Sequence, residues 1–468
     1  MNVIAIFDVG KTNKKLILFD EEYKIVWEQI YTFEETTDED GEPCEDLEKL
    51  TAWVFNSIGD LSTLDQFRIR AINFSAYGAS LVYIGKNGRP LTPLYNYLKP
   101  YPSDLRRKFY NTYGGEEVFS LQTASPVLGS LNSGMQLYRI KEQDHGLFAQ
   151  IKYALHLPQY LSFLLTGMAW SEITSIGCHT NLWNFSRNHY HEWVYREGIL
   201  DKLAPLSSSS MVLPVIAGPG GAELPDGPAF SGPLSDCLAG TGLHDSSAAM
   251  IPYLENFRDP FVLISTGTWC ISMNPFNQSP LTIDELQKDC LCYLSYLDRP
   301  VKAARLFAGY EHEHENRRLA AHFGKARDSH VSVKFEPATV AYLREKDQSL
   351  SSNTSRDRPG PSVFVQRDLS VFDSYEQAYH RLLMDIMDQQ AASTRLVLDG
   401  TAVKRIFVDG GFGRNEVYMN LLAAAFPETE VFAASMPQAT AMGAAMALHN
   451  HWNPGPMQRD IIQLRRYS

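Results

Sequence analysis

Two short segments of the chain combine glycine with hydroxyl side chains, in settings where phosphate oxygens could bind. The first is DVGKTNKK (Asp8–Lys15), and the second is STGTW (Ser265–Trp269). Each is predicted to form a tight turn between two apolar strands, which exposes backbone N–H groups beside threonine hydroxyls. Two ordinary hairpins would also need small residues at their turns. The occurrence of a matched pair, one in each half of the chain, favours the phosphate interpretation.

Two aspartates stand where they could act beside such a site. Asp8 ends the first predicted strand, where a carboxylate could hold Mg²⁺ next to phosphates; a turn-capping aspartate is the alternative. Asp245, within HDSS, opens a predicted helix near the junction of the two halves, and ligand clefts favour such junctions. As a general base it would accept a proton from a substrate hydroxyl. Asp followed by Ser-Ser is also an N-cap sequence, so the sequence leaves both roles of Asp245 open.

A third glycine-rich segment, DGGFGRN (Asp409–Asn415), follows a predicted strand and precedes a predicted helix. Its glycines would let a flat ligand lie against the backbone, and the helix N-terminus adds a favourable dipole. The Rossmann pattern G-x-G-x-x-G is not matched, and strand–helix turns often need glycines for their own geometry. The alternation EHEHEN (Glu311–Asn316) does not indicate a metal site, because histidines two residues apart point to different sides of a helix.

The hydrophobic pattern predicts the elements that position these segments. Three apolar runs within residues 2–33 predict an antiparallel meander. A strand at 68–78 ends on Tyr77 and Gly78, and the strand–turn–strand pattern of the first residues recurs at 261–273. From this recurrence we predict a domain boundary near residue 245.

Other predicted elements follow from periodicity and from turn residues. They are helices at 45–61, 158–166 (stopped by Gly167), 374–398, 415–426 and 439–448; mostly helix over 105–165; a strand at 404–411; a hairpin turning at 86–88; a loop or a short strand excursion at 207–231; and a polar loop at 349–362.

Composition narrows the class of protein. The 468 residues are 44% hydrophobic and 21% charged, which is typical of a globular chain and excludes a disordered, collagen-like or coiled-coil protein. The net charge of −12 argues against nucleic-acid or membrane-surface partners. There is no apolar run of about 18 residues and no signal sequence. The six scattered cysteines, without a C-x-x-C pair, predict a reduced, cytoplasmic protein.

Taken together, these segments resemble the FGGY carbohydrate kinases of the actin–hexokinase superfamily, over about residues 2–450. DVGKTNKK and STGTW are similar to the family's two phosphate loops, VDGGFGRN to its adenosine loop, and ATAMGAAM to its small-residue helix. Residues 132–141, 157–167 and 171–184 resemble its N-terminal signature. His244-Asp245 falls where the family keeps its catalytic aspartate.

The resemblance implies a site for Mg²⁺, ATP and a small sugar. It implies Asp245 as the general base and Asp8 as the metal ligand. The implied ATP-binding residues are Gly10, Lys11, Thr12, Asn13, Lys15, Thr266, Gly267, Thr268, Gly410, Gly411 and Asn415. The implied sugar-binding residues are Tyr77, Gly78, His244, Asp245 and Ser246.

The implied fold is α/β, with two actin-like ATPase (ribonuclease H-like) domains and a cleft between them. The expected division is an N-terminal domain at 1–243, a C-terminal domain at 244–450 and a tail at 451–468. A homodimer is left open.

The identity of the sugar is inferred from the subfamily resemblance. The segments His-Asp-Ser and Gly-Thr-Trp resemble the corresponding segments of rhamnulokinases and fuculokinases. This resemblance implies that the substrate is a 6-deoxy-ketohexose (L-rhamnulose or L-fuculose), phosphorylated on its C1 hydroxyl. The segment YNYLKPYPSDLRR departs from the usual Trp-x-Asp-x-Arg pattern, and Lys11 replaces a small residue. Kinases for xylulose, ribulose or glycerol, a non-kinase ATPase of the superfamily and a sugar-binding regulator remain as alternatives.

Overall fold

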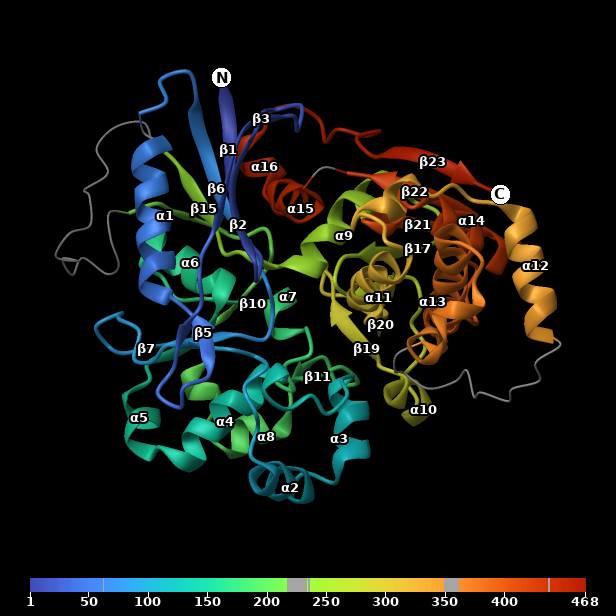
Figure 1. The fold of residues 1–468 in the computed structure, drawn as a ribbon. Coiled ribbons are helices and arrows are strands. Elements are labelled where there is room, and N and C mark those ends of the chain that lie inside the picture. Colours follow the sequence, from blue (N-terminus) through green and yellow to red (C-terminus); the bar gives the residue numbers. More distant parts are fainter. Residues whose placement is uncertain (62, 217–233, 235, 349–361, 437) are drawn as a thin grey trace. The chain divides into compact units, whose positions relative to one another are not determined.

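The computed structural model describes residues 1–61, 63–216, 234, 236–348, 362–436 and 438–468 (Figure 1). Packing groups the chain into two compact units, each assembled from separate stretches. Unit 1 consists of Met1–Asn256, Cys292–Pro300 and Pro437–Ile461, and unit 2 consists of Phe257–Leu291, Val301–Met436 and Ile462–Ser468.

The main sheet of unit 1 begins with the predicted meander, which is confirmed. Strand β1 (Asn2–Val9) pairs antiparallel with β2 (Asn13–Phe19), and β2 pairs antiparallel with β3 (Ile25–Thr32). On its other side β1 runs parallel to β6 (Arg68–Ala76). The strand order is β14-β15-β6-β1-β2-β3, with β16 also paired to β6.

Alternation along β1 separates a core face from a face that carries chemistry. Val3, Ala5, Phe7 and Val9 pack into one hydrophobic core together with residues of the helices α1 (Leu47–Leu61) and α6 (Leu157–Thr166). Asp8 therefore points to the opposite face. There the helix α15 (Ala439–Ala447) lies close, because Thr440 bonds to Asp8.

The remaining elements of unit 1 surround this sheet or form a second core beside it. Its shorter strands are β4 (Thr36–Thr37), β5 (Pro43–Glu45), β7 (Leu81–Ile84), β8 (Leu94–Tyr95), β9 (Tyr153–His156), β10 (Ser171–Glu172), β11 (Trp183–Asn184), β12 (His189–Tyr190), β13 (Leu206–Ser207), β14 (Val212–Pro214), β15 (Leu238–Gly240) and β16 (Leu243–His244). Its other helices are α2 (Ser103–Thr112), α3 (Glu116–Thr123), α4 (Ser133–Gln143), α5 (His145–Gln150), α7 (Ile173–Ile176), α8 (Glu192–Arg196), α9 (Asp245–Asn256) and α16 (His449–Trp452).

The sheet of unit 2 repeats the pairing at the start of the chain, as predicted. Strand β17 (Phe261–Thr266) pairs antiparallel with β18 (Cys270–Asn274) and parallel with β21 (Arg405–Gly410). The strand order is β19-β20-β18-β17-β21-β22-β23. The other strands are β19 (Cys290–Leu294), β20 (Pro300–Leu306), β22 (Glu430–Ser435) and β23 (Gln463–Tyr467).

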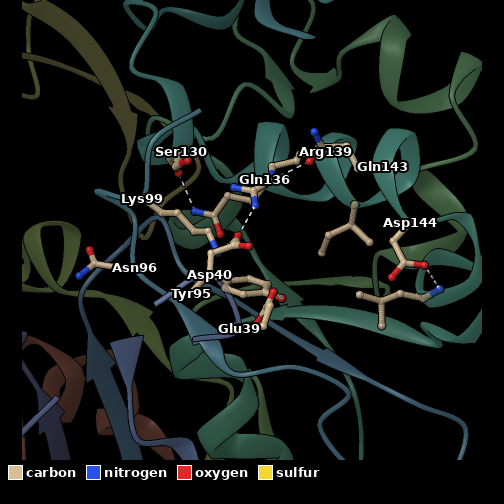
Figure 2. A pocket seen from close by; sticks show the side chains of 12 residues that line it. Glu39, Asp40, Tyr95, Asn96, Lys99, Ser130, Gln136, Arg139, Gln143 and Asp144 are labelled. Carbon is tan, nitrogen blue, oxygen red and sulfur yellow. Dashed lines mark hydrogen bonds and ion pairs between the residues drawn. The ribbon is translucent and has the colours of Figure 1, made fainter. Parts of the chain in front are cut away.

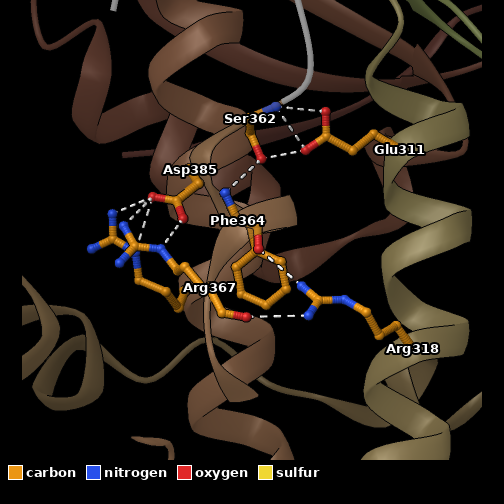
Figure 3. A network of polar contacts seen from close by, with 7 residues as sticks. Glu311, Arg318, Ser362, Phe364, Arg367 and Asp385 are labelled. Carbon is orange, nitrogen blue, oxygen red and sulfur yellow. Dashed lines mark hydrogen bonds and ion pairs between the residues drawn. The ribbon is translucent and has the colours of Figure 1, made fainter. Parts of the chain in front are cut away.

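The helices of unit 2 are tied together by buried polar contacts as well as by apolar packing. Glu311 accepts hydrogen bonds from the backbone N–H and the hydroxyl of Ser362, and Asp385 binds the guanidinium of Arg367 (Figure 3). These contacts join the segment after residue 361 to two helices. The helices are α10 (Ile283–Gln287), α11 (Ala308–Phe323), α12 (Pro337–Gln348), α13 (Tyr375–Leu398) and α14 (Glu416–Ala425).

Most predicted elements are confirmed, and the helix stop at Gly167 lies in the left-handed region with φ of 64°. The predicted hairpin over residues 81–97 is wrong in its second strand. Only an isolated bridge joins Ile84 to Pro90, and β7 pairs with β9 instead. Pro90 and Pro93 lack the N–H groups that a continuing ladder needs. Strand β9 also interrupts the helical stretch predicted over 105–165. The predicted loops at 207–231 and 349–362 lie largely outside the described residues.

The division by packing differs from the predicted one, because residues 244–256, 292–300 and 437–450 of the predicted C-terminal domain belong to unit 1. Helix α9 belongs to unit 1, because it packs closely against α15: a Cβ on Gly443 would lie 1.8 Å from the Ala248 carbonyl oxygen. Residues 451–468, predicted as a tail, contribute β23, which pairs antiparallel with β22. Within the described part of the chain, no helix is both long and apolar enough to cross a membrane.

Candidate functional site

The turn between β1 and β2 exposes backbone donors, as its sequence predicts. The Gly10 N–H donates to the Asn13 carbonyl oxygen over 2.9 Å and closes the turn. Thr12 and Asn13 are exposed, and Lys11 is partly exposed. A Cβ on Gly10 would lie 3.1 Å from that same carbonyl oxygen, so glycine allows the tight closure. The turn therefore presents N–H and hydroxyl groups that could bind phosphate oxygens.

Asp8 lies at the end of β1, on the face that α15 covers. Its side chain is buried, and its Oδ2 accepts a hydrogen bond of 2.9 Å from the Thr440 hydroxyl. Burial raises the pKa of Asp8 to about 6; the charge of Asp245 adds to this rise, and Thr440 and Lys15 oppose it. Lys15 itself donates to Gln438 over 2.6 Å. Thr440 and Gln438, which contact Asp8 and Lys15, are not among the residues that the sequence predicts for the site. Thr440 belongs to the segment ATAMGAAM, and Gln438 directly precedes it.

Asp245 is the first residue of α9, and its side chain is about one-third exposed. Its Oδ1 accepts hydrogen bonds from the backbone N–H and the hydroxyl of Ser246, and lies 3.3 Å from His244 Nε2. A capping side chain bonds the N–H groups two or three residues further along. The contact with the adjacent N–H does not follow that pattern. Burial raises the pKa of both Asp8 and Tyr97, and the negative charge of the Asp245 carboxylate adds to the rise in each.

Tyr77, Gly78 and His244 lie together in unit 1. A Cβ on Gly78 would lie 2.9 Å from the His244 ring, so a larger residue at this position would have to displace that ring. The Tyr77 ring packs edge-on against Tyr97 at 6.0 Å, and its hydroxyl donates to Glu45 over 3.3 Å. Tyr97 was missed, although its segment had been noted as a departure from the family pattern.

In unit 2, the turn between β17 and β18 carries Thr266, Gly267 and Thr268. The Thr266 hydroxyl is already engaged: it donates to the Asp409 carbonyl oxygen over 2.6 Å and accepts from the Phe412 N–H over 3.0 Å. Thr268 is exposed, and its hydroxyl makes no hydrogen bond within the part of the chain that the structure describes. Thr266 thus holds two loops of unit 2 together, and the Thr268 hydroxyl is available to a ligand.

The predicted adenosine loop lies against that turn. Gly410 has φ of 92°, and a Cβ there would lie 1.9 Å from the Thr266 carbonyl oxygen, which excludes other residues. Gly411 is exposed, and its N–H donates to the same oxygen over 3.1 Å. The Asn415 side chain caps α14 by accepting from the Tyr418 N–H, and its amide donates to the Tyr379 hydroxyl over 2.6 Å. Asn415 therefore shapes the loop.

The two histidines of EHEHEN point to different sides of α11, as their spacing predicts. His312 lies 3.0 Å from the Tyr379 hydroxyl in the interior of unit 2. His314 is largely exposed and pairs with the adjacent Glu315. Across the described ranges, no cluster of three or more His, Cys, Asp or Glu side chains is arranged to hold a metal ion.

A polar pocket of about 190 Å³ in unit 1 was not indicated by the sequence (Figure 2). The Lys99 ammonium lies 2.7 Å from Asp40 at this pocket and 2.5 Å from the buried Asp38. The Gln136 amide, beside them in Figure 2, donates to the carbonyl oxygen of Ala79 over 2.7 Å. Gln136 thereby holds the backbone directly after Gly78.

Two family models match the chain in succession. The model for the N-terminal domain of the FGGY family of carbohydrate kinases matches residues 3–216. The model for the carbohydrate kinase FGGY C-terminal domain matches residues 258–456.

Individual relatives are more distant. A rhamnulokinase of Mannheimia succiniciproducens is 25% identical over 176 residues, which are 37% of this chain and 36% of that protein. The match thus spans little more than a third of that relative's length.

Solved structures match over almost the whole chain. A carbohydrate kinase from Novosphingobium aromaticivorans has a TM-score of 0.77 at 23% identity, covering 99% of this chain and 96% of that one. A xylulose kinase from Lactobacillus acidophilus also has a TM-score of 0.77, at 16% identity, covering 100% and 94%. At such identities the likeness shows the fold alone, and it confirms the predicted two-domain α/β class. Together with the two family models, which cover most of the chain, this shows that the protein belongs to the FGGY family of carbohydrate kinases.

Proposed function

We propose that this chain transfers the γ-phosphoryl group of ATP to the C1 hydroxyl of a ketose, with a 6-deoxy-ketohexose such as L-rhamnulose or L-fuculose as the favoured substrate. The observation that carries the proposal is that strand β6 brings the partly exposed Asp245 and Asp8 together within unit 1. Ser75 of β6 is opposite Asp8, and Ala76 of β6 is opposite His244, the residue before Asp245. Family membership supports a sugar kinase. The rhamnulokinase match and the His-Asp-Ser sequence support the 6-deoxy sugar.

In this proposal unit 1 provides the groups that bind the sugar and accept its proton. The sugar lies beside Tyr77 and Gly78, and Asp245 accepts the proton of the attacking hydroxyl through its carboxylate oxygens. The hydrogen bonds from Ser246 fix the direction of that carboxylate. Within unit 1, the N–H groups of the Gly10–Asn13 turn donate to phosphate oxygens, which carry the charge as the phosphoryl group is transferred. Within unit 2, the exposed Thr268 hydroxyl is a further donor for phosphate.

Asp8 fits the role of a magnesium ligand. Mg²⁺ in kinases is typically held by one or two carboxylates together with substrate phosphates and water, so a single carboxylate beside a phosphate-binding turn suffices. Burial raises the pKa of Asp8 to about 6, and a cation beside the carboxylate would favour its charged form. A bound Mg²⁺ would neutralise phosphate charge, and Thr440 would hold Asp8 in place.

The decisive experiment is a panel of ketoses and polyols assayed for ADP formation. We expect ketose-dependent ADP, fastest with L-rhamnulose or L-fuculose, and a sugar 1-phosphate as product. Faster turnover of xylulose, ribulose or glycerol would mean that this compound, and not a 6-deoxy-ketohexose, is the substrate. The proposed phosphoryl transfer would still hold. ADP formation that no sugar stimulates would favour a non-kinase ATPase, and absence of any turnover would favour a sugar-binding regulator.

The raised pKa of Asp8 predicts that the free energy of unfolding depends on pH. Because its folded-state pKa of about 6 exceeds the ordinary aspartate pKa of 3.8, the stability that Asp8 contributes is fully present below pH 3.8 and is lost as the pH rises through 6. We expect the unfolding free energy of the unliganded protein to fall, relative to Asp8→Asn, by about 2–3 kcal/mol between pH 4 and 7.5. Urea unfolding of both proteins across this range measures the difference; a difference that does not change with pH would contradict it.

Substitutions of the two threonines of the β17–β18 turn should differ in their effect on thermal stability. Thr268→Val should lower kcat/KM for ATP by about 10- to 150-fold, the equivalent of one lost hydrogen bond to a charged group, with unchanged thermal stability. Thr266→Val should in addition lower the melting temperature, because it removes the two hydrogen bonds by which the Thr266 hydroxyl holds the backbone at Asp409 and Phe412. Steady-state kinetics and calorimetry separate the two; wild-type kinetics for Thr268→Val would remove that hydroxyl from the ATP site.

A further inference from the structure

A buried lysine stands on the core face of β2. Lys14 is opposite Val9 in the strand register and shares its face with Leu16 and Leu18, which belong to the hydrophobic core. Its side chain is 1% exposed, and its ammonium lies 2.8 Å from Oε1 of Glu45, whose side chain is 3% exposed. The alternation of β2 would have predicted an apolar residue here.

Stability alone does not explain this ion pair. Desolvating two charges costs about as much as their attraction returns, and apolar replacements of buried pairs are often neutral or stabilising. The further contacts of the pair suggest another role. The Lys14 ammonium also donates to the carbonyl oxygen of Lys11 over 3.0 Å. The second carboxylate oxygen of Glu45 accepts from the Tyr77 hydroxyl over 3.3 Å.

The two ends of this chain of contacts lie at the two proposed binding places of unit 1. Lys11 is in the β1–β2 turn, on the phosphate side, and Tyr77 adjoins Gly78, on the sugar side. The ends also approach each other directly. The Lys11 ammonium lies 5.8 Å from the centre of the Tyr77 ring and pairs with Glu35 over 2.6 Å. A displacement of either end therefore strains contacts of the other.

We infer that Lys14 and Glu45 are positioning residues that couple the phosphate turn to the sugar-side tyrosine, so that binding of the ketose tightens binding of ATP. The inference rests on the proposed function. Such coupling is reciprocal, and it typically amounts to about 5- to 150-fold in affinity. The proposed coupling also gives a role to Lys11, which stands where the family has a small residue: its carbonyl oxygen accepts from Lys14.

The test removes both buried charges together. Lys14→Met/Glu45→Leu fills the core face with apolar side chains, and we expect its melting temperature to equal or exceed that of the wild type. The measured quantity is the ratio of the dissociation constants of the ATP analogue AMP-PNP without and with the fastest ketose of the panel. We expect this ratio to be at least about 5 for the wild type and to fall close to 1 in the double variant. The KM values for ATP and ketose should both rise.

Two further variants keep the result decisive. Lys302→Met removes a buried ammonium of unit 2 that pairs with Glu285, and it should lower stability without changing the ratio. If the double variant does not fold, Tyr77→Phe keeps the ring and removes the hydroxyl that donates to Glu45, and it should lower the ratio.

A folded double variant, or in its place Tyr77→Phe, with the wild-type ratio and wild-type KM values would overturn the inference and leave the kinase assignment intact. A wild-type protein without ketose-dependent ADP formation would overturn the proposed function, and the inference with it.

Discussion

Asp245→Asn is expected to lower kcat by about 10²- to 10⁴-fold, the usual contribution of a general base. Asparagine has nearly the same shape, but its neutral amide cannot accept the proton of a sugar hydroxyl as a carboxylate does. Binding of ATP and ketose should persist, because the variant keeps the groups of the β1–β2 turn and of the Tyr77 side. Quenched-flow or steady-state assays of phosphorylation, with binding measured separately by calorimetry, test this split.

The structure allows the same variant to preserve stability. Asp245 accepts hydrogen bonds from the N–H and hydroxyl of Ser246 through Oδ1, and an asparagine carbonyl oxygen can accept both. The unfolding free energy should therefore stay within about 0.5 kcal/mol of the wild type.

Asp245→Ala and Ser246→Ala serve as the matched controls for Asp245→Asn. The alanine at 245 loses the base and the local hydrogen bonds together, and Ser246→Ala loses only one bond to the carboxylate. Near wild-type phosphorylation by Asp245→Asn would mean that Asp245 only shapes the start of α9, and the base would have to be sought elsewhere.

The second large effect is expected at the contact between α9 and α15. A Cβ at Gly443 would lie 1.8 Å from the carbonyl oxygen of Ala248, a backbone atom that can move only with its helix. Gly443→Ala should therefore lower the unfolding free energy by about 3 kcal/mol, the upper part of the range for overpacking. It should also lower kcat, because Asp245 on α9 and Thr440 on α15 move apart.

Gly59→Ala is the matched control for this substitution. Gly59 also lies within a helix, α1, and a Cβ there meets no atom within 4 Å. That substitution should stabilise the protein by about 0.5–1 kcal/mol through helix propensity. Denaturant unfolding of both variants gives the comparison. Equal stabilities would show that α9 and α15 can separate freely, and that their close approach does not hold Asp245 in place.

Local patterns in the sequence were enough to predict the elements and the turns. The apolar runs of β1, β2 and β3 and the recurrence at β17 and β18 predicted both hairpins, because strand alternation and turn glycines are set by neighbouring residues. The same holds for Gly167, whose left-handed conformation ends α6. The strand predicted after Gly88 does not pair with β7, because Pro90 and Pro93 lack the N–H groups that a ladder needs. The sequence itself contained this information.

The sequence by itself therefore determined the strand–turn–strand frameworks, the glycines at the close approaches and the identity of Asp8 and Asp245 as candidates. Only the tertiary structure showed that Thr440, 432 residues away, bonds to Asp8, that Thr266 is engaged in holding the Asp409–Asn415 loop, and that Lys14 is buried against Glu45. Hydrogen bonds between distant residues depend on how whole helices and sheets pack. Packing is decided by the summed burial of many side chains, and no short segment carries that information.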